Sequence, residues 1–363
     1  MPSTGNRYVS AWTWLVPVLS LALLVVAIAV GVGTVLGMLC AAALIGAVLA
    51  AVHHAEVVAH RVGEPFGTLV LALSVTVIEA ALVLSLMFGS SDSDPTLVRD
   101  TIYAVVMIIC NGIVGICILL GGLTHHEQSF RVEGAGAGLE ALMVLSVLIL
   151  VVPVFTTTTP AGTLSASQLV FVAVASAVLW AIFVFIQTVR HRDYFLPVID
   201  ADDPDVHAVP PTARQAWLSF VLLLASLVAV VGLAKKLSPA IQGVLERAGA
   251  PDAALGIVIA IVVLMPEAWA ALRAARANRL QTSMNLAIGS ALATIGLTIP
   301  VVVLTAIAAG LPLTLGLAPK EMIMLALTFL VITVTLGTGR THMMQGAVHL
   351  VIFGAFVFLT FVG

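Results

Sequence analysis

The sequence predicts an all-α polytopic membrane protein with about 11 transmembrane helices. Of its 363 residues, 61% are apolar and only 9% are charged, whereas soluble domains average about 45 to 50% apolar residues. The mean hydropathy of +1.17 agrees with this class. Apolar runs recur along the whole chain, and each approaches the roughly 20 residues that an α-helix needs to cross a bilayer.

Clusters of proline, glycine and charged residues delimit these runs. A helix is predicted near each of residues 12–30, 33–53, 66–89, 97–123, 138–155, 166–189, 214–234, 253–274, 282–309, 320–338 and 342–362. The first run follows a single positive charge, Arg7, and only a poor match to a cleavage box follows it. We therefore expect the first helix to be retained.

One long polar stretch, residues 190–213, divides the chain. Its aspartates and prolines favour a linker, and the alternative of a Ca²⁺ sensor is weakened because the aspartates lack EF-hand spacing. The side of the membrane that holds this stretch and the N-terminus carries about twice as many Lys and Arg residues as the other side, and the positive-inside rule makes that side cytoplasmic. The acidic linker and the N-terminus are therefore predicted to face the cytoplasm.

Charge and cysteine content exclude several classes of function. The net charge is −3 and is spread over connecting segments, which leaves no basic domain for nucleic acid. Cys40, Cys110 and Cys117 all lie in apolar runs, with neither metal-ligand nor disulfide spacing. No cofactor is implied.

Two glutamates lie where a membrane helix normally excludes charge. Glu79 is near the middle of the third predicted helix and Glu267 near the middle of the eighth. A carboxylate at mid-bilayer costs at least about 2.5 to 3.5 kcal/mol, so each glutamate is a functional candidate. Neither helix carries Lys or Arg at that depth, and desolvation favours the neutral acid. Each group can then exchange its proton for a cation, unless it only holds helices together.

The two glutamates lie on helices that run in opposite directions, because the third and eighth helices are an odd number of helices apart. This is the arrangement of inverted repeats. Residues 78–82 resemble residues 266–270, and each segment precedes a helix with a small, polar centre, at 110–115 and 289–294. The sequence therefore predicts inverted repeats.

Oxygen groups accompany both glutamates. Pro266 has no N–H, so the Val262 carbonyl loses its helical partner and is free for an ion or water. Thr76 lies one turn before Glu79 on the same face. Such hard oxygen ligands suit Ca²⁺ or Na⁺ better than a thiolate-seeking metal. The predicted ligands for the cation and the proton are Glu79, Glu267, Thr76, Asn111, Ser290 and the backbone carbonyl of Val262.

Several stretches are similar to a known family. They are residues 54–69, 74–79, 99–101, 107–109 and 111–112 in the first half, and 266–267, 284–290, 293–294, 298–300 and 338–341 in the second. These stretches resemble the bacterial Ca²⁺/H⁺ and Na⁺/H⁺ antiporters of the ChaA type, within the cation/Ca²⁺ exchanger superfamily. The resemblance covers nearly the whole chain.

The resemblance implies an additional N-terminal helix in residues 1–30, a first five-helix repeat in 31–189 and an inverted second repeat in 214–363. It implies that Glu79 and Glu267 are the two ion-binding glutamates. It also implies that the protein lies in a bacterial cytoplasmic (inner) membrane. The chain departs from the superfamily signature Gly-Asn-Ala-Thr-Glu, because residues 75–79 lack its Asn and Gly. The missing amide ligand leaves the cation preference open.

Histidines and one further glutamate are weaker candidates. The cytoplasmic end of the second helix carries His53, His54, Glu56 and His60. We favour the interpretation that this group is an ordinary solvated helix end. A cytoplasmic gate or proton relay is the second interpretation, and a transition-metal site is the third. Glu64 is a helix-end charge or part of a cation access path, and His349 is a hydrogen-bonded buried residue or a relay. The candidates for a gate or relay are His60, Glu64 and His349.

The favoured function is secondary active antiport: cytoplasmic Ca²⁺, with Na⁺ or K⁺ as further candidates, leaves while protons enter by alternating access. The expected partners are the lipid bilayer, inorganic cations and protons. We expect neither nucleic acid nor an obligate protein partner, and the oligomeric state is open. The rivals are a passive cation channel and an intramembrane metalloenzyme built on the histidine group, which lacks a recognised zinc signature.

Overall fold

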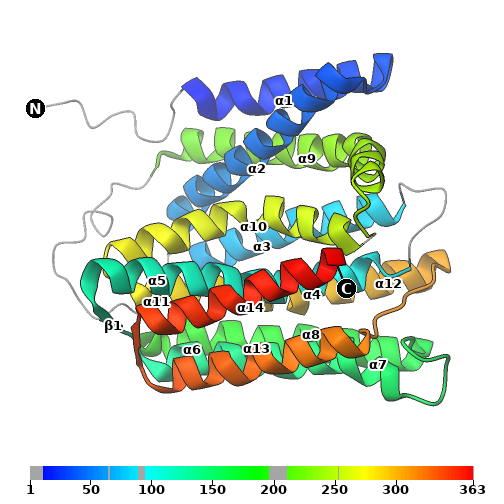
Figure 1. Cartoon of the computed structure of the whole chain (residues 1–363). Helices are drawn as coiled ribbons and strands as arrows, with labels where there is room; N and C mark the ends of the chain where they lie inside the picture. The colour runs from blue at the N-terminus through cyan, green and yellow to red at the C-terminus, as the bar shows by residue number, and fades with distance from the viewer. Residues whose placement is uncertain (1–10, 64–65, 89–94, 196–210, 252, 363) are drawn as a thin grey trace, which may run out of the picture. The chain divides into compact units, whose positions relative to one another are not determined.

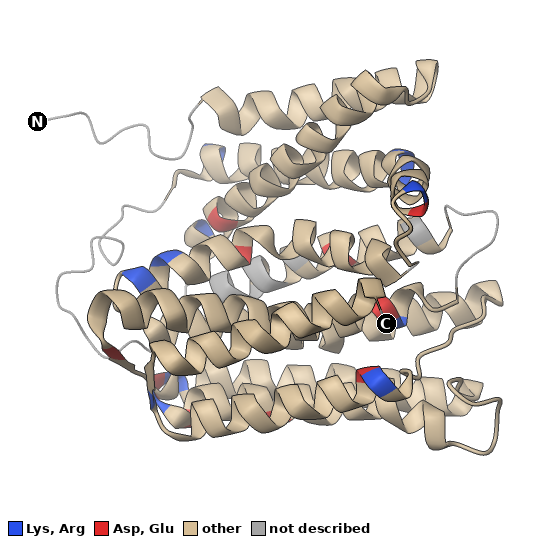
Figure 2. Cartoon of the chain, viewed as in Figure 1, with Lys and Arg blue, Asp and Glu red and all other residues tan. Residues whose placement is uncertain are grey.

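The computed structural model describes residues 11–63, 66–88, 95–195, 211–251 and 253–362, and nearly all of these are helical (Figure 1). Ten helical spans in the described ranges are long and apolar enough to cross a membrane. Together with α3 (Phe66–Met87) they follow the eleven predicted segments in number and order. Charged residues are sparse along the helices and gather near their ends (Figure 2). The predicted fold class, an all-α polytopic membrane protein, is confirmed.

One compact unit comprises Met1–Ser93 and Asp202–Gly249. Its described helices are α1 (Ala11–Val30), α2 (Thr34–Val62), α3 and α9 (Ala213–Arg247). Helix α2 packs against the other three helices of the unit. Helices α2 and α9 have 29 and 35 residues, which exceeds the roughly 20 residues of a membrane crossing.

The second compact unit comprises Asp94–Ala201 and Ala250–Gly363. Its helical elements are α4 (Leu97–Met107), η1 (Ile108–Ile113), α5 (Val114–His125), α6 (Val132–Ser146), η2 (Val147–Val151), α7 (Val152–Phe155), α8 (Ala166–Phe185), η3 (Ile186–Arg190), η4 (Arg192–Tyr194), α10 (Ala253–Arg276), α11 (Leu280–Ala293), η5 (Thr294–Thr298), α12 (Ile299–Ala309), α13 (Pro319–Gly337) and α14 (Met343–Val362). Four of these, η1, η2, η3 and η5, are π-helical turns. Such turns inside α-helices occur frequently at functional sites.

Helix α9 is longer than the sequence predicts. The predicted end at residue 234 precedes Lys235 and Lys236, yet the helix continues to Arg247 and contains Pro239. A lysine near the end of a membrane helix extends its ammonium group toward water along its apolar stem. The two lysines therefore mark the expected edge of the apolar run and not the end of the helix.

A short antiparallel strand pair joins distant parts of the second unit. Strand β1 (Glu127–Ser129) pairs with β2 (Arg340–His342), with Gln128 opposite Thr341. The pairing connects the end of α5 to the start of α14. The sequence does not predict these strands, because three residues are too few to show an alternating pattern.

Residues 311–318 form an extended connection between α12 and α13 within the second unit. Leu313, Leu315 and Leu317 are buried. The backbone N–H of Thr314 donates to Pro95 O, and that of Leu317 donates to Leu150 O, both at 2.9 Å. Buried backbone N–H groups need hydrogen-bond partners within the protein, and these bonds provide them at Thr314 and Leu317.

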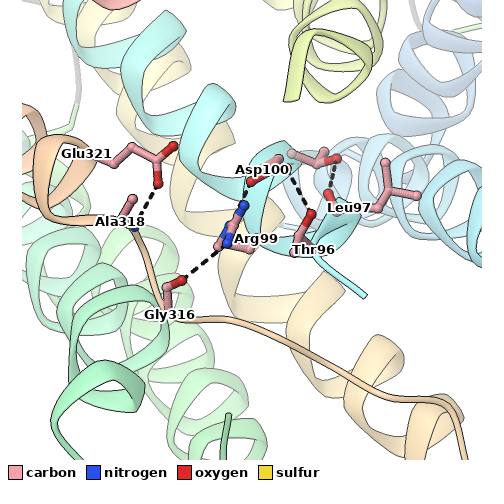
Figure 3. Close-up of polar contacts among 8 residues, drawn as sticks. Thr96, Leu97, Arg99, Asp100, Gly316, Ala318 and Glu321 are labelled. Carbon is pink, nitrogen blue, oxygen red and sulfur yellow. Dashed lines mark hydrogen bonds and ion pairs between the residues drawn. The ribbon is translucent and has the colours of Figure 1, made fainter. Parts of the chain in front are cut away.

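An ion pair borders this connection (Figure 3). Arg99 Nε donates to Asp100 Oδ1 at 2.7 Å, and Arg99 Nη1 donates to the carbonyl of Gly316 at 3.4 Å. The second carboxylate oxygen of Asp100 accepts from Thr96 Oγ1 at 3.2 Å. The Glu321 carboxylate caps α13 by accepting the Ala318 N–H at 2.9 Å. These contacts fix the start of α4 and the start of α13.

The two compact units do not coincide with the predicted repeats. Helix α9, which begins the predicted second repeat, packs with α2 and α3 of the predicted first repeat. Packing therefore divides the chain differently from the proposed duplication, and the boundaries 1–30, 31–189, 190–213 and 214–363 stay predictions.

Candidate functional site

Glu79 lies within α3, on the buried side of the helix. Its exposed fraction is 4%, and that of Thr76, one turn earlier, is also 4%. Val77, between them in sequence, is 50% exposed. Thr76 and Glu79 therefore share one buried face, as the i,i+3 spacing predicts. Their role as ligands stays a prediction.

Glu267 lies in α10 directly after a proline. Pro266 is inside the helix, which continues without interruption from Ala253 to Arg276. Because proline has no N–H, the Val262 carbonyl receives no i+4 hydrogen bond from residue 266. Helix α10 packs against α4, α5, η1 and α11. The helix of Glu267 thus lies beside the π-helical turn that carries Asn111.

Asn111 occupies the centre of a buried hydrogen-bond network. Its amide nitrogen donates to Thr328 Oγ1 at 2.9 Å, and its amide oxygen lies 3.2 Å from His349 Nδ1. On the other side of the imidazole ring, Thr335 Oγ1 lies 3.1 Å from His349 Nε2. Asn111, Thr328 and His349 have no exposed surface. The structure therefore brings together Asn111 and His349, which the sequence singles out separately.

Close helix packing allows this network to form. A Cβ atom at Gly115 would lie 2.9 Å from His349 Cβ, and one at Gly346 would lie 2.4 Å from the backbone nitrogen of Leu119. Small residues of this kind let two membrane helices approach closely. They place α14 directly against α5, and His349 beside Asn111.

Thr328 and Thr335 are partners of the site that were not predicted from the sequence. Both lie in α13 and are buried, with exposed fractions of 0% and 3%. Their spacing of seven residues puts them on one face of the helix. Two threonines two turns apart in an apolar helix were the available signal, but the sequence does not say which residues they contact.

The polar centre of the span Leu280–Ala309 also contains a π-helical turn, η5, which begins at Thr294. Thr294 Oγ1 donates to the carbonyl of Ser290 at 3.0 Å. Ser290 is half-buried and Thr294 is buried. The equivalent turn η1 lies in the span Leu97–His125. Each predicted small, polar centre therefore overlaps or meets a π-helical turn.

The histidine group at the end of α2 divides into two environments. His54 is 1% exposed, and its Nε2 donates to the carbonyl of Thr13 in α1 at 2.7 Å. Glu56 and His60 are exposed. In the part of the chain that the structure describes, no group of three or more His, Cys, Asp or Glu residues could hold a metal ion. Glu64 lies outside the described residues.

Comparison with known proteins identifies similar chains. Residues 32–189 and 218–362 match the family described as sodium/calcium exchanger protein. The y4hA protein of Sinorhizobium fredii (strain NBRC 101917 / NGR234) is 45% identical over 98% of this chain and 97% of its own length. The sodium-potassium/proton antiporter ChaA of Escherichia coli (strain K12) is 38% identical over 85% of this chain and 84% of its own. The crystal structure of the H⁺/Ca²⁺ exchanger CAX shows the same fold, with a TM-score of 0.72 and 16% identity over 97% of this chain and 88% of that one.

Proposed function

Because the chain belongs to the sodium/calcium exchanger protein family, we propose that it exports cytoplasmic Ca²⁺, with Na⁺ and K⁺ as further candidate cations, in exchange for protons. The membership confirms the resemblance to the cation/Ca²⁺ exchanger superfamily. The chain is an integral membrane protein and a secondary transporter of cations, not an enzyme. The exchanged ions, the site residues and the mechanism belong to the proposal.

The observation that carries the proposal is a carboxyl group buried within an apolar helix, Glu79 at 4% exposure. A buried carboxyl group is stable when it holds either a proton or a cation, since both neutralise its negative charge. Glu79 and Glu267 alternate between the two ligands. Only protein whose glutamates hold a cation or protons then switches the site from one side of the membrane to the other, as antiport requires.

Oxygen ligands complete the proposed cation site. Thr76 shares the buried face of Glu79, and the Val262 carbonyl lacks its helical donor because of Pro266. Asn111 and Ser290 supply an amide and a hydroxyl oxygen. His60 and Glu64 stay candidates for the cation access path.

The candidate cations Ca²⁺, Na⁺ and K⁺ are supported by the family description and by the name of one relative. The family description joins sodium and calcium, and the printed name of the Escherichia coli relative joins sodium, potassium and protons. Hard oxygen ligands accommodate all three metal ions. We place the protein in the bacterial cytoplasmic membrane, with its N-terminus and its acidic linker in the cytoplasm, because that side carries more Lys and Arg.

Everted membrane vesicles with a fluorescent pH probe test the exchange directly. Separate additions of Ca²⁺, Na⁺ and K⁺ should each report whether that cation drives proton movement, and vesicles without the protein give the background. A passive channel is the rival, since the same carboxylates could form a filter. An imposed pH gradient that cannot drive the cation against its own gradient would establish the channel and refute antiport.

A further inference from the structure

We propose that His349 and Thr328 are positioning residues that hold the Asn111 carboxamide in one of its two orientations, with its oxygen available to the transported cation. The proposal rests on the proposed function, in which Asn111 contributes an oxygen ligand. The two positioning residues lie in α14 and α13, far from Asn111 in sequence, and each contacts one end of its amide group.

Thr328 selects the nitrogen end of the amide. Its hydroxyl donates to the Met324 carbonyl at 2.8 Å, with Met107 Sδ as a second acceptor at 3.4 Å. In either case the hydroxyl proton is taken by an acceptor other than Asn111. The Thr328 oxygen can then only accept from Asn111, at 2.9 Å, and only the NH₂ end of the carboxamide can donate.

His349 matches the oxygen end. In the orientation that Thr328 selects, the amide oxygen faces Nδ1 at 3.2 Å and can only accept, so the neutral ring carries its proton on Nδ1. In the neutral ring Nε2 is then the acceptor, and Thr335 Oγ1 supplies the donor at 3.1 Å. The imidazole therefore has partners on both sides, with its Nδ1 donor facing Asn111, and the Cys110 carbonyl is a further acceptor beside the ring.

The orientation of the amide decides whether Asn111 can bind a cation. A carboxamide turned by half a rotation would present its two N–H donors to the cation in place of its oxygen. Partners that orient a metal ligand are commonly worth about 10- to 100-fold in metal affinity. A carbonyl oxygen has two lone pairs, so the bond from His349 leaves one for the cation.

Burial makes the selection effective. Asn111, Thr328 and His349 are completely buried, so each polar atom depends on its protein partners. Reversing the amide would set its oxygen against the Thr328 oxygen, and it would require the other tautomer of His349 because the N–H donors would then face Nδ1. The close approach of α14 to α5 at Gly115 places His349 beside η1.

Two substitutions at residue 349 separate positioning from proton relay. In His349→Asn the side-chain NH₂ replaces the Nδ1 donor, whereas in His349→Gln the side chain reaches the Nε2 position and the Nδ1 donor is lost. Neither amide titrates, so both variants remove a proton relay equally. Positioning predicts that H349N keeps its cation affinity within about threefold, whereas H349Q loses about tenfold or more.

Thr328 provides an independent pair. Thr328→Val removes the acceptor for the Asn111 amide nitrogen while keeping the volume, and should weaken cation affinity about tenfold. Thr328→Ser keeps the hydroxyl and should retain the affinity. Monodispersity and melting temperature on each purified variant exclude those that have not folded.

The readout is binding of Ca²⁺, Na⁺ or K⁺ to the purified full chain by titration calorimetry at one fixed pH, with exchange measured separately. Equal losses in H349N and H349Q, or unchanged affinity in both H349Q and T328V, would overturn the positioning role. A wild-type protein that binds a cation but exchanges no protons would refute the proposed antiport and leave this test intact.

Discussion

His54 Nε2 donates a 2.7 Å hydrogen bond to the carbonyl of Thr13, across 41 positions of sequence. Pro17 lies four residues after Thr13 inside α1 and has no N–H, so it leaves that carbonyl without its i+4 helical donor. A side chain from α2 supplies a donor. Within its own compact unit, the protein thus shows that a proline in a membrane helix opens a carbonyl to an outside partner.

Pro266 in α10 should open the Val262 carbonyl in the same way. Pro266→Ala restores an N–H, which should bond to the Val262 carbonyl and withdraw an oxygen ligand from the cation. We expect weaker cation affinity, together with a gain in thermal stability, because proline in a helix interior is unfavourable by roughly 3 kcal/mol relative to alanine. Cation titration and thermal unfolding of one purified variant measure both effects.

Pro239 in α9 provides the matched control. Pro239→Ala restores a backbone N–H inside a second helix, outside the proposed ligand set. It should raise thermal stability without changing cation affinity. An unchanged affinity in the Pro266 variant would remove Val262 from the site and leave Pro266 a role in packing only.

A second prediction concerns the contact between α5 and α14. Gly346→Ala places a Cβ atom 2.4 Å from the Leu119 nitrogen and 2.7 Å from the Gly115 oxygen, both backbone atoms. We expect a loss of about 1 to 3 kcal/mol, as for other overpacked positions, and a lower melting temperature. Gly354→Ala, in the same helix, meets nothing within 4 Å. It should be neutral or stabilising by up to about 1 kcal/mol, and equal melting temperatures for the two variants would contradict the packing described.

A third prediction concerns the ion pair at the start of α4. Arg99 and Asp100 have side chains that are 18% and 6% exposed. Arg99→Met leaves the buried Asp100 carboxylate without its cation and should cost about 2 to 3 kcal/mol, less than a fully buried pair because Arg99 partly reaches solvent. The double variant Arg99→Met/Asp100→Leu removes both charges and should recover most of the loss. A double variant no more stable than the single one would show that the charge balance is unimportant there.

A fourth prediction concerns pH. Protons and the cation compete for the same carboxyl groups, so apparent cation affinity should weaken as the pH falls through their coupled titration. Initial exchange rates at several cation concentrations, repeated over a range of pH, measure this shift. An affinity that is constant over the whole active range would indicate a separate proton path, for which His60 and His349 are the candidates.

The sequence was sufficient for features that depend on local composition. Each of the eleven predicted segments is helical, and Glu79, Glu267 and Pro266 lie inside helices. These predictions depend on apolar runs of about 20 residues and on the cost of a charge within them, and both are readable from a single stretch of chain.

Features that depend on distant contacts were not predictable. The sequence singles out Asn111 and His349 separately, but their hydrogen bond spans 238 positions. Thr328 and Thr335 resemble any other threonines in an apolar helix until α13 is placed against η1 and α14. The length of α9 was missed for a different reason, since Lys235 and Lys236 end the apolar run without ending the helix.

In the proposed mechanism, Glu79 and Glu267 exchange a cation for protons. Wild-type protein and the variants Glu79→Gln and Glu267→Gln are reconstituted in liposomes that enclose a pH probe, and a Ca²⁺ gradient is applied. Glutamine keeps the size of glutamate but does not take up and release a proton in the physiological range, so we predict no Ca²⁺-driven proton movement in either variant. Aspartate at either position should retain reduced exchange, and Glu140→Gln, at an exposed position in α6, should behave as wild type. Near-normal proton movement in the Glu79→Gln or the Glu267→Gln variant would contradict the paired-carboxylate mechanism.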